Sequence, residues 1–176
     1  MEEMKTLGTF WLGGCSGCHM SFLDLDEQLV ALNQRARVVA SPFMDTRALP
    51  EHMDIALVEG AVSMDEHLVQ LQRIRERSRI LIAFGDCAVN GNVTAMRNCS
   101  NHKTSLLERF STTPVAQQRS DHLPQVLERV VPLHTVVPVE YHLPGCPPDA
   151  DLIWRVLDDL LDGRNPTFEL EHRAND

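Results

Sequence analysis

The run WLGGCSGCHMS occupies residues 11–21. It follows a short apolar segment and leads into a pattern typical of a helix, with three glycines and two cysteines at the junction. A Cys-x-x-Cys pair between a strand and a helix can be a redox dithiol or half of a metal site. The other cysteines of the sequence indicate which of these two chemistries applies.

Composition limits the classes of protein to consider. The 176 residues are 43% apolar and 23% charged, which indicates one globular domain, expected over 1–165, with a polar tail over 166–176. The net charge of −9 argues against a nucleic-acid partner. No apolar stretch approaches the roughly 20 residues that span a bilayer, so we expect no membrane insertion. The acidic start lacks an apolar leader, which predicts a cytoplasmic protein whose thiols stay reduced.

Short apolar runs alternate with helical patterns along the chain. Strands are predicted at 7–12, 37–40, 53–58 and 80–84, helices at 21–32, 65–77, 123–131 and 149–162, extended chain at 135–142 and a long loop at 98–122. This alternation predicts an α/β fold, a mostly parallel sheet with helices on both faces.

Four of the five cysteines follow predicted strands. Cys15 and Cys18 come after the first strand, Cys87 comes after the buried run 80–84, and Cys146 lies between the last extended segment and the last helix. Loops that follow parallel strands gather at the carboxyl edge of the sheet, where ligands bind. We therefore expect these four thiols to meet at one point. The fifth, Cys99, is expected to be a small buried residue.

Four thiolates suit either zinc or an iron–sulfur cluster. Zinc sites with four cysteines usually have two Cys-x-x-Cys pairs, whereas this chain has one pair and two single cysteines, which favours a bulkier 4Fe–4S cluster. The competing dithiol oxidoreductase, using Cys15 and Cys18, leaves Cys87 and Cys146 unexplained.

These motifs resemble those of a known family. WLGGCSGCHMS, VEGA, GDCA and LPGCPPD occur in the order seen in the small subunits of nickel–iron hydrogenases, which resemble the 20-kDa subunit of NADH:ubiquinone oxidoreductase. The short chain with CHMSFLDLD is most similar to the soluble, NAD-reducing, bidirectional type. The resemblance implies a flavodoxin-like fold. It also implies one proximal 4Fe–4S cluster held by Cys15, Cys18, Cys87 and Cys146.

The resemblance implies an electron relay and no catalytic residue on this chain. Electrons from the nickel–iron site of a large subunit would pass through the cluster to iron–sulfur and flavin diaphorase subunits that reduce NAD. We expect no FMN, because the cysteine loop occupies the place of a hydroxyl-rich phosphate loop. The alternative is a quinone-linked cluster subunit like that of complex I, although that relative has adjacent cysteines in its first motif.

Several neighbours of the cysteines are candidates to surround the cluster: Glu59, His19, Gly14, Gly85 and Gly145. The glycines allow close approach of backbone N–H groups to the cluster. Glu59 is expected either near the cluster or the large-subunit interface, or as a solvated carboxylate at a strand end. His19 is expected to be an ordinary residue of a helix N-terminus, and Asp86 and Asp149 are expected to be helix caps.

Overall fold

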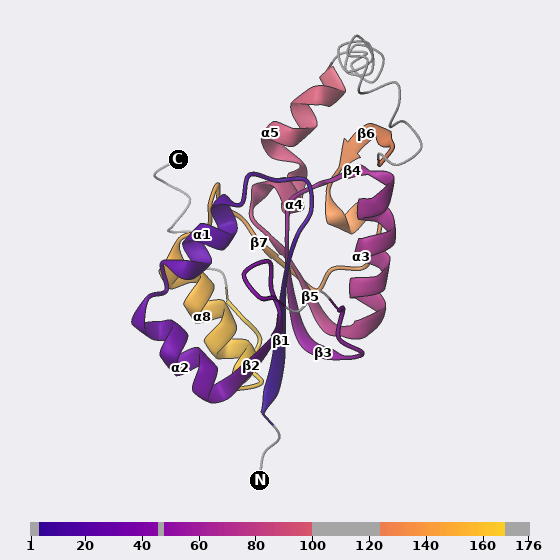
Figure 1. Ribbon diagram of the computed structural model, residues 1–176. Helices are drawn as coiled ribbons and strands as arrows, with labels where there is room; N and C mark the ends of the chain where they lie inside the picture. The colour runs from indigo at the N-terminus through magenta and orange to yellow at the C-terminus, as the bar shows by residue number, and fades with distance from the viewer. Residues whose placement is uncertain (1–3, 46–47, 100–123, 168–176) are drawn as a thin grey trace.

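A five-stranded parallel sheet forms the centre of the protein. The computed structural model describes residues 4–45, 48–99 and 124–167 (Figure 1). The strands are β1 (Lys5–Trp11), β2 (Ala36–Ala40), β3 (Met53–Glu59), β5 (Ser78–Phe84) and β7 (Tyr141–Leu143). Their order is β2-β1-β3-β5-β7, and every pair is parallel. This is the strand order of the flavodoxin-like fold, so the predicted fold class is confirmed.

Helices cover both faces of this sheet. One face carries α1 (Gly17–Leu23), α2 (Glu27–Arg35) and α8 (Ala150–Leu161), and the other carries α3 (Asp65–Arg77) (Figure 1). Successive residues of a strand point to opposite faces. Leu57 accordingly packs in the core beneath α1, α2 and α8, while Val58 packs in the core beneath α3. Each helix therefore needs only one apolar stripe.

The two longest helices lie where their apolar periodicity predicts. The expected 65–77 helix is α3, and the expected 149–162 helix is α8. The buried residues of α8 recur at helical spacing: Ile153, Val156, Leu157 and Leu160.

Two predicted helices are wrong. The 21–32 segment is not one helix, because α1 ends at Leu23 and α2 begins at Glu27, with Asp26 at φ 47° between them. The 123–131 segment contains a strand, β6 (Val126–Val131), which pairs antiparallel with β4 (Val62–Met64). That partner lies about 60 residues earlier, so local periodicity could not reveal the pairing.

The segment after β5 is more ordered than expected at its start. α4 (Asp86–Asn90), α5 (Asn92–Ala95) and the 3₁₀ helix η1 (Met96–Cys99) follow one another, whereas 100–122 lies outside the described residues. The extended prediction for 135–142 holds only at its end, because the 3₁₀ helix η3 (Leu133–Thr135) precedes β7. Most of the predicted tail, 168–176, is also outside the description. Among the described helices, none has the length and apolar content to cross a membrane.

Candidate metal centre

Three cysteine-bearing loops reach the carboxyl edge of the sheet. Cys15 and Cys18 follow β1, Cys87 follows β5, and Cys146 follows β7. The second and third loops are joined directly, because the Asp86 N–H donates to the Gly145 carbonyl over 2.9 Å and the Gly145 N–H donates to Asp86 Oδ1 over 2.8 Å. The Cys87 and Cys146 loops therefore hold one another in place.

Gly85 brings the first loop against the second. It has φ +83°, and a Cβ built there would lie 2.1 Å from Cys18 Sγ. A side chain at this position would occupy the space of the sulfur. The backbone of the Cys87 loop thus approaches the Cys18 thiol as closely as a glycine permits.

The thiols influence one another electrostatically. Burial is the largest cause raising the pKa of Cys18, followed by Glu59 and then by the other three cysteines, Cys87, Cys15 and Cys146. Cys87, Cys15 and Cys146 all lie close enough to Cys18 to oppose its ionisation, so the four cysteines share one neighbourhood. The structure therefore brings the four predicted cysteines together. Cys99 is exposed at the end of η1, so the prediction that it is buried is wrong.

A backbone donor already points at one of the sulfurs. The Gly17 N–H lies 3.4 Å from Cys15 Sγ. Burial raises the pKa of Cys87, whereas hydrogen bonds from the hydroxyl and backbone N–H of Thr94 lower it. Hydrogen bonds to sulfur stabilise the anionic form of a thiolate ligand.

Glu59 and His19 form a buried pair behind Cys18. Their exposed fractions are 1% and 2%. The His19 backbone N–H donates to Glu59 Oε2 over 3.0 Å, and His19 Nδ1 contacts the same oxygen. The expectation of an ordinary helix-terminal histidine is therefore wrong, and the solvated placement of Glu59 is excluded. Both residues are buried because α1 folds over the end of β3.

The aspartates next to the loops have different roles. Asp149 caps α8, its Oδ1 accepting from the N–H groups of Asp151 and Leu152, as predicted. Asp86 is not a cap, because Gly85 holds the cap position of α4 and the Asp86 carboxylate binds Gly145 instead.

Sequence reasoning missed Ser21, whose hydroxyl donates to the Pro148 carbonyl over 2.5 Å and joins α1 to the Cys146 loop. Its place in the CHMS motif is the only signal that could have identified it.

The donor set fits an iron–sulfur cluster. Among residues 4–45, 48–99 and 124–167, no three His, Cys, Asp or Glu side chains are grouped to bind a single metal ion. The ligands of a cluster are farther apart, because each cysteine binds a different iron. The close approach of Gly85 to the Cys18 sulfur and the Gly17 N–H that points at the Cys15 sulfur match what an anionic cluster requires. His19 Nε2 is also buried without a hydrogen-bond partner beside this region.

A separate cavity of about 680 Å³ opens at the ends of β1 and β2. Thr9, Trp11 and Ser41 line it on the sheet side, and Gln70 and Arg73 line it from α3. No cysteine among the described residues lines this cavity. The cavity is therefore distinct from the thiol site.

Known proteins share this chain's sequence and fold. Residues 15–160 match the family described as NADH ubiquinone oxidoreductase, 20 Kd subunit. The NAD-reducing hydrogenase HoxS subunit delta of Cupriavidus necator is 42% identical over 99% of this chain and 86% of its own length. A relative in Archaeoglobus profundus, an iron-sulfur subunit of an F420-non-reducing hydrogenase, is 30% identical over 88% of this chain. The aligned region covers only 55% of the length of that relative. A crystal structure of an NAD+-reducing [NiFe]-hydrogenase in the H2-reduced state contains a chain with a TM-score of 0.86 and 39% identity. The alignment covers 96% of this chain and 97% of that one.

Proposed function

The chain belongs to the family of the NADH ubiquinone oxidoreductase 20 Kd subunit, among its hydrogenase subunits, and we propose that it relays electrons within an NAD-reducing nickel–iron hydrogenase. The convergence of Cys15, Cys18, Cys87 and Cys146 at one sheet edge carries this proposal. In it, 1–165 form one cluster-binding domain in the cytoplasm, where thiols remain reduced.

The four thiolates would hold one 4Fe–4S cluster. When bound, such a cluster accepts and donates one electron at a time. The chain's own residues fix the ligands: Gly85 admits the Cys18 sulfur, and Asp86 ties the Cys87 loop to Gly145. The apolar residues beneath α1 keep water from the Cys18 side.

The partners follow from the role of a relay. The nickel and iron would be held by a large subunit, because the four convergent cysteines of this chain are used to bind the cluster. The relay also needs diaphorase subunits with iron–sulfur clusters and flavin to pass electrons to NAD. The names of the relatives, an NAD-reducing hydrogenase and an NAD+-reducing [NiFe]-hydrogenase, support this assembly.

Anaerobic purification of the full-length chain from its native cells tests these partners. We expect a nickel-containing subunit and a flavin-containing diaphorase to copurify with it, and the complex to reduce NAD with hydrogen. Copurification with a quinone-reducing membrane assembly instead would favour the role of a complex I-like subunit.

A further inference from the structure

We propose that Asp86 is a positioning residue whose carboxylate sets the spacing between Cys87 and Cys146, and thereby retains the iron that Cys146 would bind. This inference rests on the proposed function, because it assumes that both cysteines are cluster ligands. Asp86 directly precedes Cys87, and Gly145 directly precedes Cys146. Each partner in the contact between the two loops is therefore the immediate neighbour of a ligand.

Two hydrogen bonds join Asp86 to Gly145, and they run in opposite directions. The Asp86 N–H donates to the Gly145 carbonyl over 2.9 Å, and Asp86 Oδ1 accepts from the Gly145 N–H over 2.8 Å. A single bond would fix a distance and still allow the loops to pivot, whereas the pair fixes the orientation as well. Only the second bond uses a side chain, so it is the bond that substitution of Asp86 removes.

The Cys146 loop transmits this contact to the thiol because the loop is tightly closed. Gly145 has φ +131°, and a Cβ there would lie 2.5 Å from Pro148 Cα. The residues before and after Cys146 therefore lie against each other, with Cys146 at the tip of a short turn. Because the Cys146 side chain is exposed, the position of its sulfur depends on how the two ends of this turn are anchored.

The other end of the turn is anchored to α1. The hydroxyl of Ser21, which is buried, donates to the Pro148 carbonyl over 2.5 Å. This bond remains when Asp86 is substituted, so the turn stays attached at Pro148 and can pivot there. The expected effect is therefore local to Cys146, rather than detachment of the whole loop.

The iron bound by Cys146 should be the one that is lost. A 4Fe–4S cluster is held by four cysteine thiolates, one for each iron. Ferricyanide can remove one electron from a cluster whose fourth ligand is loosely held, and one iron then leaves as Fe²⁺. The electron passes to ferricyanide and the Fe²⁺ passes to a chelator. The remaining irons keep their cysteines and all of the sulfide, as a 3Fe–4S cluster.

Asparagine separates the hydrogen bond of Asp86 from its charge. Asp86→Asn keeps an oxygen that can accept from the Gly145 N–H and loses the negative charge, whereas Asp86→Ala loses both. The alternative to positioning is that the negative charge of Asp86 acts on the cluster directly. In that case the asparagine variant would behave like the alanine variant.

Asp149 supplies a matched control. It lies three residues after Cys146, and its Oδ1 also accepts from backbone N–H groups, those of Asp151 and Leu152. Asp149→Ala removes a carboxylate acceptor, as Asp86→Ala does, but the lost bonds cap α8 and join no two cysteine loops. This variant measures the effect of a general loss of stability near Cys146.

The test is the rate of Fe²⁺ release to a colorimetric chelator after ferricyanide is added to the anaerobically purified intact complex. Asp86→Ala should release about one iron per chain roughly tenfold faster than wild type, because a hydrogen bond to a charged group is lost. The oxidised variant should then give the EPR signal of a 3Fe–4S cluster. Asp86→Asn and Asp149→Ala should release iron at the wild-type rate. Asp86→Leu replaces the alanine variant if the latter does not assemble.

A wild-type rate in Asp86→Ala or Asp86→Leu would overturn the inference. Equal acceleration in Asp86→Asn would also overturn it, because the charge would then be responsible. Equal acceleration in Asp149→Ala would do the same, because loss of stability would explain the release. Wild-type protein that lacks iron and sulfide contradicts the proposed function itself, whereas a normal cluster with unchanged iron release in the variants contradicts only the role of Asp86.

Discussion

Gly85 meets the strictest steric requirement of any single residue at the cysteine site. Its backbone adopts a positive φ, and its missing side chain leaves room for the Cys18 sulfur. Gly163 also has a positive φ, of +73°, but a Cβ there would meet nothing within 4 Å. Substitutions at the two glycines therefore distinguish the free-energy cost of a positive φ, which both share, from the steric clash with the Cys18 sulfur, which only Gly85 has.

We expect Gly85→Ala to abolish cluster loading, because the methyl group and the Cys18 sulfur cannot share one position. Gly163→Ala should load iron normally and lose only about 1 kcal/mol of unfolding free energy. Iron and acid-labile sulfide analysis of both purified variants measures the difference. Equal iron content in the two variants would refute the steric argument.

His67 is a second residue with a measurable consequence. It is 8% exposed on α3, where the Ser63 N–H donates to its Nδ1 over 3.3 Å. Burial lowers the pKa of His67, although the neighbouring Glu66 and Asp65 raise it in part. The folded protein therefore keeps this ring neutral at a pH where the unfolded chain binds a proton.

The unfolding free energy should therefore fall as the pH drops below about 6.5, and His67 should contribute nothing to the slope above that pH. His67→Gln should reduce the slope below pH 6.5 by up to about 1.4 kcal/mol per pH unit. Urea denaturation at several pH values measures this, with the exposed His52→Gln as the control. If the unfolding free energy of His67→Gln and of wild type depends on pH with the same slope below pH 6.5, His67 is not the group responsible.

At this scale the sequence predicted the meeting of the four cysteines better than the burial of the residues around them. Cysteines in glycine-rich loops after strands can be recognised as candidate ligands from their thiol chemistry and their place at the carboxyl edge of the sheet. The burial of Glu59 and His19 depends on how α1 closes over β3, and no local pattern reports that packing.

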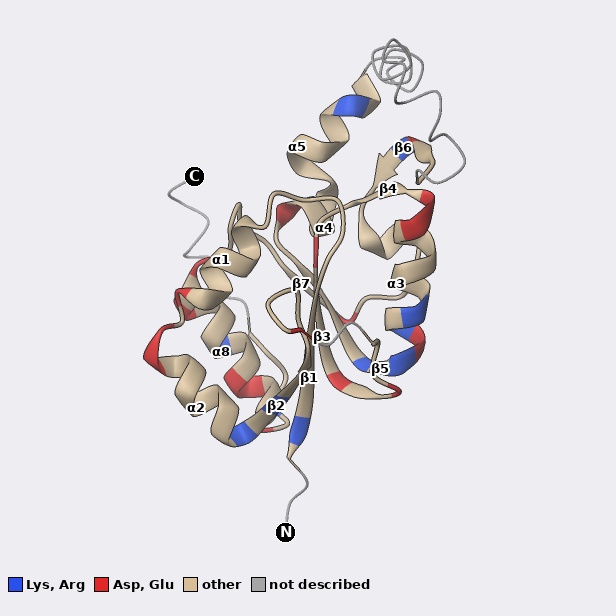
Figure 2. Ribbon diagram, in the orientation of Figure 1, with Lys and Arg blue, Asp and Glu red and all other residues tan. Residues whose placement is uncertain are grey.

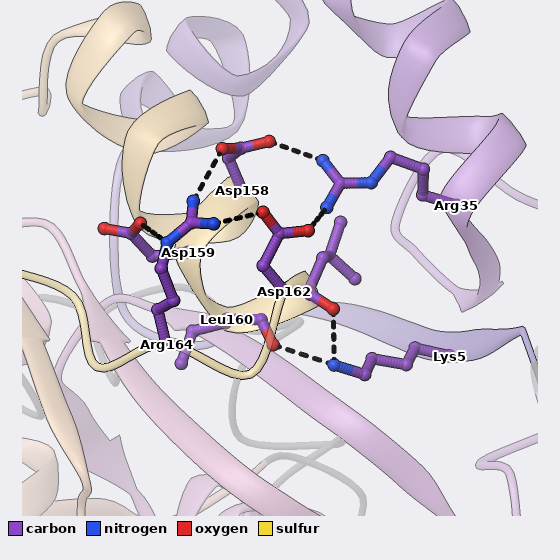
Figure 3. A network of polar contacts seen from close by, with 8 residues as sticks. Lys5, Arg35, Asp158, Asp159, Leu160, Asp162 and Arg164 are labelled. Atoms are coloured by element: carbon purple, nitrogen blue, oxygen red, sulfur yellow. Dashed lines mark hydrogen bonds and ion pairs between the residues drawn. The ribbon is translucent and has the colours of Figure 1, made fainter. Parts of the chain in front are cut away.

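At the scale of elements, a network of charged groups joins α2 to α8. Arg35 contacts both Asp158 and Asp162, and Arg164 binds Asp159 over 2.8 Å on the same helix end (Figure 3). Lys5 of β1 adds hydrogen bonds of 3.0 and 2.6 Å to the last carbonyls of α8. These contacts fasten the α8 end that lies farthest from the Cys146 loop.

Arg35→Gln should lower the unfolding free energy by about 1 kcal/mol, because the arginine bridges two partly exposed carboxylates. The loss should shrink in about 1 M salt, where the Debye length is only about 3 Å. Denaturant titration at low and high salt measures both effects. Arg37→Gln, at an exposed position on β2, is the control and should stay within about 0.5 kcal/mol of wild type. A loss that salt does not change would mean that packing, rather than charge, explains the effect.

Elements with strong internal periodicity could be predicted, and those defined by distant partners could not. The 65–77 and 149–162 helices each have a clear apolar stripe. β6 is a strand only because β4 lies beside it, and the 21–32 apolar pattern continues through the break at Asp26. The sequence pattern alone therefore reveals neither the pairing of β4 with β6 nor the helix break at Asp26.

At the scale of the whole molecule, charge is distributed unevenly over the helices that cover one face of the sheet. Figure 2 marks acidic positions at the turn between α1 and α2 and on α8, whereas α1 carries no Lys, Arg, Asp or Glu. The neutral α1 presents an exposed Met20, 52% accessible, two residues after Cys18. The alternation of strands and helices was sufficient to predict the sheet and the edge at which the cysteines meet, because parallel crossover connections leave few topologies.

Iron and acid-labile sulfide analysis of the anaerobically purified wild-type protein, with EPR of its reduced form, tests the convergence of the four cysteines most directly. We expect about four iron and four sulfide per chain, with loss of the EPR signal when Cys87 or Cys146 is replaced by alanine. Bound zinc, or a metal-free protein with a reversible Cys15–Cys18 disulfide, would contradict it.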